Sequence, residues 1–147
     1  MANWTISFDC GSTWGFQGNG NQTIDWKSID GGGNGSVLGD TFDCPASGTG
    51  NITEFWIRFD SDNAADFHWP GHPPDDPPIQ SDEFDGWALA SHEFGHATGF
   101  NGHIGASTSL CDPGNIDLHT MCASIFQGLA RQRVLEVHDV DTFQSVY

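Results

Sequence analysis

The sequence predicts an α+β fold, in which strands come first along the chain and helices follow. Short apolar stretches separated by Gly, Asn and Thr occupy residues 1–60, whereas patterns with helical spacing begin only after residue 80. The chain has 147 residues and contains no internal repeat. A chain of this length forms one hydrophobic core and does not readily divide into two. We therefore expect a single domain over residues 1–147.

The predicted strands are brief and lie between turn-forming residues. They cover Thr5–Phe8, Trp14–Phe16, Thr23–Ile29, Val37–Phe42 and Ile52–Phe59. In the last of them Phe55, Ile57 and Phe59 occupy alternate positions, which is the pattern of a strand with one buried face. Residues 30–35 are rich in glycine and predict a loop.

The helices are predicted in the second half of the chain. Residues 61–80 are acidic and rich in proline, which interrupts helices and central strands, so we expect a loop there. The first helix should carry Asp82, Glu83 and Asp85 in its first turn, where carboxylates stabilise the positive end of the helix dipole. Gly99 would end it. Residues 101–122 lack periodicity, and a final helix is expected from about Ile125 to Val146.

The charge of the chain excludes several classes of partner. Twenty acidic residues against four basic ones give a formal net charge of −16. Such a chain cannot neutralise phosphates, so nucleic-acid binding is excluded and anionic membrane surfaces are disfavoured. No run of 18 apolar residues is present, so no membrane insertion is expected. We expect a monomer.

Cysteines and glycosylation sequons bear on the cellular compartment. The four cysteines are Cys10, Cys44, Cys111 and Cys122. No two of them form a C-x-x-C pair. Disulfides are favoured over free buried thiols, and of the three possible pairings we prefer the local one, 10 with 44 and 111 with 122. N-x-S/T sequons begin at Asn3, Asn21, Asn34 and Asn51, where about 1.2 would arise by chance. The first residues do not form a signal peptide, so we expect either a cytosolic protein or a mature fragment, and secretion is the favoured interpretation.

The most informative segment runs from His92 to His103. His92 and His96 are one helical turn apart, so their imidazoles point about 40° apart and can reach one ion. Glu93 points about 100° away, which suits a general base acting on metal-bound water. Gly99 lets the chain turn back so that His103 supplies a third nitrogen. Three imidazoles with one open position are typical of catalytic zinc, whereas structural zinc has four protein ligands, commonly thiolates.

This extended motif resembles that of the metzincin metallopeptidases. The resemblance implies a tight turn that carries a methionine beneath the metal, and Met121 is the candidate for this Met-turn. Within the metzincins the chain is most similar to the matrixins, over roughly residues 36–147. Residues 92–97 resemble their helix motif, 37–42 and 57–60 two of their strands, and 138–147 their closing helix.

The matrixin resemblance implies the details of the fold. It implies a small twisted, mostly parallel sheet with an antiparallel edge strand, an active-site helix and a C-terminal helix. The strand subdomain would span about residues 1–103, and the Met-turn and helix subdomain about 104–147. Two positions depart from the family pattern: Asp139 follows His138 instead of a second acid, and Cys122 follows Met121 where the family has Tyr or a similar residue.

The same resemblance implies how a peptide would bind. The substrate would pair with the edge strand, and the side chain after the scissile bond would enter a pocket lined by residues 118–124. The substrate-binding residues would be Val37, Leu38, Gly39, Asp40 and Thr41.

Other candidate sites are weaker. A second zinc site could use His68 and His72 with Asp66 or Asp75, and structural calcium could bind Asp60, Asp62 and Asp66 or the loop 30–35; solvated loops are favoured in each case. Packing roles near the Met-turn are expected for His119 and His138, and core or rim positions for Trp56, Trp69 and Trp87.

The sequence thus predicts a secreted zinc-dependent endopeptidase acting on polypeptides. Zinc would be held by His92, His96 and His103, and Glu93 would act as general base. One alternative is a zinc-binding homologue that acts as an interaction module, although that role would not need Glu93. Another takes Glu136 as third ligand, as gluzincin peptidases do, which His103 makes unnecessary.

Overall fold

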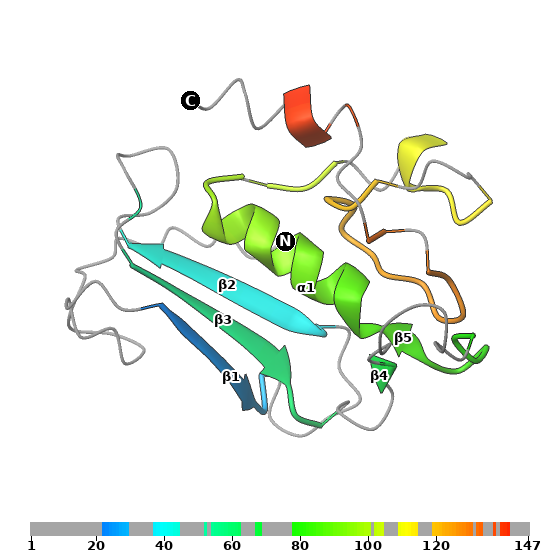
Figure 1. The fold of residues 1–147 in the computed structure, drawn as a ribbon, viewed down its shortest axis with the longest axis horizontal. Coiled ribbons are helices and arrows are strands. Elements are labelled where there is room, and N and C mark those ends of the chain that lie inside the picture. Colours follow the sequence, from blue (N-terminus) through cyan, green and yellow to red (C-terminus); the bar gives the residue numbers. More distant parts are fainter. Residues whose placement is uncertain are drawn as a thin grey trace.

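The computed structural model confirms the α+β class. It describes residues 22–29, 37–44, 52, 54–62, 67–68, 78–100, 102–104, 109–114, 119–130, 132–133, 137 and 139–141. Within them a small mixed sheet packs against one long helix (Figure 1). The predicted strands Thr5–Phe8 and Trp14–Phe16, the asparagines of the four sequons and Cys10 lie outside this part of the chain. None of the helices in the described part has the length and apolar character needed to cross a membrane.

Three strands form the main sheet in the order β1-β3-β2. They are β1 (Thr23–Lys27), β2 (Gly39–Cys44) and β3 (Glu54–Asp60). The central strand β3 is parallel to β1 and antiparallel to β2. In this order β2 is an edge strand, and it lies beside the helix α1 (Figure 1). Each strand lies within two residues of its predicted position, and the antiparallel edge strand is the expected one.

The central strand is buried on both faces, so the prediction of one buried face was wrong. On the α1 side, Ile57 and Phe59 pack with Leu89 of the helix. On the other side the Arg58 guanidinium lies 4.0 Å from the centre of the Trp56 ring, and both side chains are buried. A charged side chain that stacks on an aromatic ring can be buried together with it. A pattern that counts charged residues as exposed therefore does not predict the burial of this face.

Helix α1 (Gly86–Ala97) begins later than predicted. Asp85 is its N-cap and accepts hydrogen bonds from the amides of Trp87 at 3.0 Å and Ala88 at 3.3 Å. No acidic residue lies in the first turn, so the placement of Asp82 and Glu83 there was wrong. Instead β5 (Phe84–Asp85) pairs in parallel with β4 (Phe67–His68), a short strand within the segment predicted as loop. The capping carboxylate thus sets the start of the helix.

The C-terminal helix also begins later than the predicted Ile125. Residues 125–130 are not helical, and the described helical residues in this region are 137 and 139–141 (Figure 1). Gly128 has a φ of 71°, which is incompatible with a right-handed helix, and its amide donates to the Glu83 carbonyl. The segment therefore packs as a turn against the start of α1. The 3-10 turn η2 (Ser109–Cys111) precedes this segment in the chain.

Candidate metal centre

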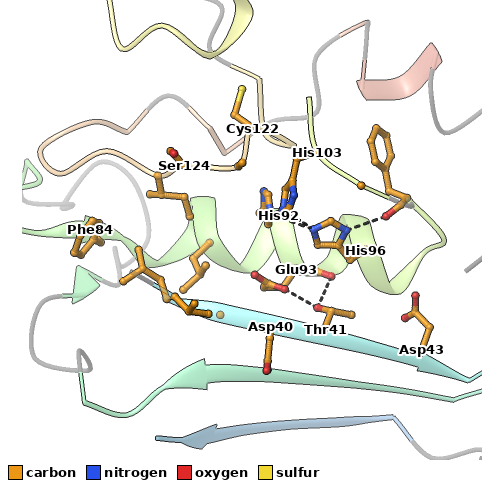
Figure 2. Close-up of a pocket in the computed structure, with 18 residues that line it drawn as sticks. Asp40, Thr41, Asp43, Phe84, His92, Glu93, His96, His103, Cys122 and Ser124 are labelled. Atoms are coloured by element: carbon orange, nitrogen blue, oxygen red, sulfur yellow. Dashed lines mark hydrogen bonds between the residues drawn. The ribbon is translucent and has the colours of Figure 1, made fainter. Parts of the chain in front are cut away.

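Three histidines converge on one point beside the sheet, as the sequence predicts. The Nε2 atoms of His92 and His96 are 3.1 Å apart, those of His96 and His103 3.2 Å, and those of His103 and His92 3.1 Å. The first two project from successive turns of α1, and the third follows the end of the helix (Figure 2). Gly99, with a φ of 100°, provides the left-handed turn that brings the chain back. Among the described residues this is the one group able to hold a metal ion.

Hydrogen bonds orient two of the three rings. The Nδ1 atom of His92 lies 2.8 Å from the Thr120 carbonyl, and that of His96 lies 2.8 Å from the Phe100 carbonyl. A carbonyl can only accept, so each Nδ1 carries the proton and each Nε2 keeps its lone pair. Burial lowers the pKa of His92 to about 4 and also lowers the pKa of His96 and of His103. The cluster is therefore a set of neutral nitrogen donors suited to a cation.

Glu93 lies beside this cluster and points toward β2 (Figure 2). Its side chain is 4% exposed, and the Thr41 hydroxyl donates a 2.7 Å hydrogen bond to its Oε2. Burial raises the pKa of Glu93 to about 7, while the Thr41 hydrogen bond lowers it and the charge of Asp40 raises it. A carboxyl group whose pKa lies near neutrality can both accept and release a proton.

A cleft of about 740 Å³ opens over the histidines and Glu93. One wall is the edge of the sheet, where all five predicted substrate-binding residues lie: Val37, Leu38, Gly39, Asp40 and Thr41. The opposite wall is residues 122–125, and Phe84 lies at one end of the cleft (Figure 2). Leu89, which belongs to the apolar cluster that Phe84 packs against, also lines the cleft. The cleft thus brings the edge strand, the histidines and the segment after Met121 together. Leu118, predicted to line it, lies outside the described residues.

Met121 is fully buried and packs against α1. A Cβ atom added to Gly95 would lie 2.3 Å from the Met121 sulfur. The absence of a side chain at Gly95 therefore lets the methionine approach the helix closely.

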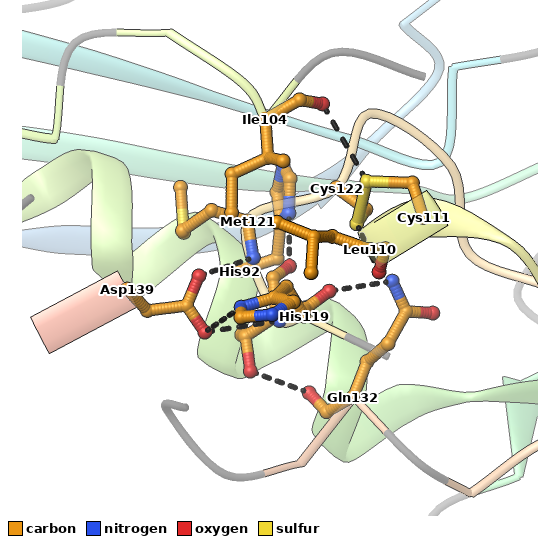
Figure 3. A network of polar contacts seen from close by, with 10 residues as sticks. His92, Ile104, Leu110, Cys111, His119, Met121, Cys122, Gln132 and Asp139 are labelled. Carbon is orange, nitrogen blue, oxygen red and sulfur yellow. Dashed lines mark hydrogen bonds and ion pairs between the residues drawn. A yellow bond between two sulfur atoms is a disulfide. The ribbon is translucent and has the colours of Figure 1, made fainter. Parts of the chain in front are cut away.

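A buried polar network holds the Met121 segment in place (Figure 3). The Asp139 carboxylate accepts hydrogen bonds from the amides of Thr120 at 3.3 Å and Met121 at 3.4 Å. The side chain of Gln132 donates to the carbonyls of His119 at 3.2 Å and Ser124 at 3.0 Å. His119 is buried in this network, as expected, whereas the role of Gln132 was missed because nothing in the local sequence signals it.

The Cys111–Cys122 disulfide links the cleft wall to η2, which confirms that half of the predicted pairing. Next to it, the Ile104 amide donates a 2.9 Å hydrogen bond to the Met121 carbonyl. The segment that carries His103 is thus joined to the Met121 segment by a parallel bridge between Ile104 and Cys122, and the disulfide joins η2 to the same segment. The second predicted pair includes Cys10, outside the described residues.

Each of the other candidate metal sites includes side chains outside the part of the chain that the structure describes. Asp60 is fully buried, and its Oδ1 accepts hydrogen bonds from the amides of Ile29 and Asp62, both at 3.3 Å. This arrangement stabilises a turn, so the prediction of a solvated carboxylate at Asp60 was wrong. Trp56 is buried and Trp87 is half exposed. The side chains of Asp66, His68, Trp69, His72, Asp75 and His138 lie outside the described residues.

Comparisons with known proteins identify no relative of this chain. No protein-family model matches the chain, and no curated protein or solved structure shows significant similarity to it.

Proposed function

We propose that the protein is a zinc-dependent endopeptidase. The observation that carries this proposal is the position of a buried carboxyl group, Glu93, beside three converging neutral imidazoles at the bottom of an open cleft. Metal-dependent hydrolysis requires these parts: a cation with an open position, a base that can reach the attacking water, and room for a substrate.

The donor set fits zinc better than it fits calcium or magnesium. Nitrogen donors around a tetrahedral zinc ion at 2.0–2.1 Å lie about 3.3–3.4 Å apart, close to the 3.1–3.2 Å between the Nε2 atoms here. Calcium and magnesium prefer oxygen ligands and would not select three imidazoles. The set supplies three ligands, so a fourth position stays free for water or substrate. When bound, zinc lowers the pKa of its water and polarises the substrate carbonyl.

The residues of the chain would perform the proton transfers. Glu93 takes a proton from the attacking water and later passes it to the leaving amine, while the carbonyl carbon gains the hydroxyl oxygen and its bond to nitrogen breaks. Its pKa of about 7 suits both transfers. The bonds from His92 and His96 to backbone carbonyls keep the ligand nitrogens directed at the metal.

The substrate would bind as an extra strand. Strand β2 has one edge paired with β3, and its other edge borders the cleft, so an extended peptide can pair with its backbone. The side chain after the scissile bond would enter the cleft between α1 and residues 122–125, which form its opposite wall. An acidic enzyme would attract basic substrates and repel acidic ones.

The metzincin-like architecture is part of this proposal. It is supported by the mixed sheet with an antiparallel edge strand, by the helix that carries two of the histidines, and by Met121 packed beneath them. The disulfide and the absence of a spanning helix among the described residues are compatible with secretion, which we also propose.

The test compares wild type with Glu93→Gln. Wild type should cleave casein or gelatin and contain one zinc ion per chain; the variant should keep the zinc and lose at least about 100-fold in activity. Zinc in both proteins with no cleavage of a broad peptide library by either would refute the peptidase and favour an interaction module. A stoichiometry of two would indicate a second zinc site.

A further inference from the structure

We propose that Thr41, with the space left by Gly39, positions the Glu93 carboxylate for its proton transfers. Both residues belong to the edge strand β2, and neither is a candidate metal ligand. This role rests on the proposed peptidase function, and it assigns two residues of β2 to keeping the general base Glu93 in position.

The Thr41 hydroxyl contacts Glu93 at two points. It lies 2.7 Å from the carboxylate Oε2 and 3.1 Å from the backbone carbonyl oxygen of the same residue. A hydroxyl donates one hydrogen at a time, and the shorter contact favours the carboxylate. Because the carboxylate and the backbone carbonyl of Glu93 both contact this hydroxyl, the side chain is restricted to the rotamer that faces β2. Figure 2 shows these two contacts below the histidines.

Gly39 accommodates the other carboxylate oxygen. It precedes Thr41 by two residues, so the two positions share one face of the strand. A Cβ atom at Gly39 would lie 2.8 Å from Glu93 Oε1 and 3.1 Å from its Cδ and Cγ atoms. An alanine there would displace the carboxylate, whose end can rotate at little cost to the fold. One oxygen is therefore hydrogen-bonded by β2 and the other lies against its backbone.

This arrangement links the base to the strand that would bind substrate. A general base acts only within about 2.6–3.2 Å of the proton it takes, so a carboxylate free to rotate spends much of its time out of reach. Residues that orient a group in a metal site typically change activity by about 10–100-fold when removed. Loss of the Thr41 hydroxyl should therefore lower kcat by this factor and leave KM within about 2-fold, since the backbone of β2 is unchanged.

The experiment uses three variants and one control in the full chain. Thr41→Val removes the hydroxyl and keeps the shape, Thr41→Ser restores the hydroxyl, and Gly39→Ala displaces the carboxylate. Thr23→Val makes the same chemical change at an exposed position of the outer strand β1. All proteins are produced in a host that does not glycosylate, because Thr23→Val also removes the sequon that begins at Asn21. Steady-state kinetics on one peptide and zinc affinity by chelator competition are measured for each.

The expected pattern separates positioning from a structural effect. Thr41→Val and Gly39→Ala should lose about 10–100-fold in kcat with zinc affinity unchanged, Thr41→Ser should recover to within about 3-fold, and Thr23→Val should equal wild type. If wild type cleaves peptides and Thr41→Val keeps full kcat, the positioning role is refuted while the peptidase stands. If wild type cleaves nothing, the proposed function fails first.

A readout without zinc tests the contact directly. In the zinc-free protein, Thr41→Val should lower the denaturant midpoint of unfolding, and this shift should shrink to half or less when Glu93 is already replaced by alanine. Equal shifts in the two backgrounds would show that Thr41 and Glu93 are not coupled and would overturn the inference.

Discussion

The contact between Gly95 and Met121 offers a direct test of how the histidine-bearing helix is seated. Gly95 lies between the histidines of α1, and a Cβ atom added to it would come within 2.3 Å of the buried Met121 sulfur. Atoms in van der Waals contact lie about 3.5–4.0 Å apart, so Gly95→Ala forces the helix or the methionine to move. Overpacking of this kind costs about 1–3 kcal/mol.

The net effect combines this cost with the helix propensity of alanine. Replacing glycine in a helix interior stabilises by up to about 1 kcal/mol, which offsets part of the clash. We therefore expect Gly95→Ala to lower the free energy of unfolding by about 1–2 kcal/mol. In a Met121→Ala background, which itself costs about 2–5 kcal/mol, the clash is absent and the same substitution should stabilise. The sign of the effect should reverse.

Chemical denaturation of the four zinc-free proteins measures this cycle. Wild type, both single variants and the double variant are unfolded in urea, and the coupling is the difference between the two effects of Gly95→Ala. A coupling near zero, with the alanine neutral or stabilising in both backgrounds, would refute the packing of Met121 beneath the helix.

Three further predictions follow from other contacts. His96→Ala should weaken zinc binding by more than about 100-fold in chelator competition, and unchanged binding would refute its role as ligand. Burial raises the pKa of Asp40 to about 6 despite the attraction of Arg58, so its ionised form destabilises the fold above pH 6. Asp40→Asn should then stabilise by about 1 kcal/mol at pH 8, after allowance for partial exposure, and the gain should vanish by pH 4; a pH-independent effect in thermal melts would contradict this. Replacing Cys111 and Cys122 by serine, which opens a loop with a sequence separation of 11, should cost about 3 kcal/mol in urea unfolding.

Some features of the site were predictable because they depend on local geometry alone. The spacing of His92 and His96 places two imidazoles on one helix face in any α-helix, and a glycine at position 99 permits the return of the chain toward His103. The edge strand could likewise be located, although its bounds shifted by two residues. Periodicity and backbone conformation are properties of a few neighbouring residues, so the sequence carries them directly.

The errors arose either where the local pattern allows more than one arrangement or where a distant contact decides the conformation. The alternation in β3 predicted one buried face, yet Arg58 and Trp56, which stack on each other on the other face, are also buried. The carboxylates before α1 were expected in its first turn, but Asp85 caps the helix and begins it later. The final helix was extended to Ile125, where Gly128 and its bond to the Glu83 carbonyl impose a turn. The partner of Gly128, which lies far away in the chain, cannot be identified from spacing.

The sequence by itself determined the chemistry available to this protein: a strongly acidic chain, three imidazoles at fixed offsets and one carboxyl group beside them. Only the tertiary structure decided how that chemistry is arranged. The hydroxyl that contacts Glu93 is 52 residues away, and the carbonyl that orients His92 is 28 residues away. Helical periodicity determines which residues share one face of a helix. The orientation and protonation of their side chains depend on groups that only folding brings near.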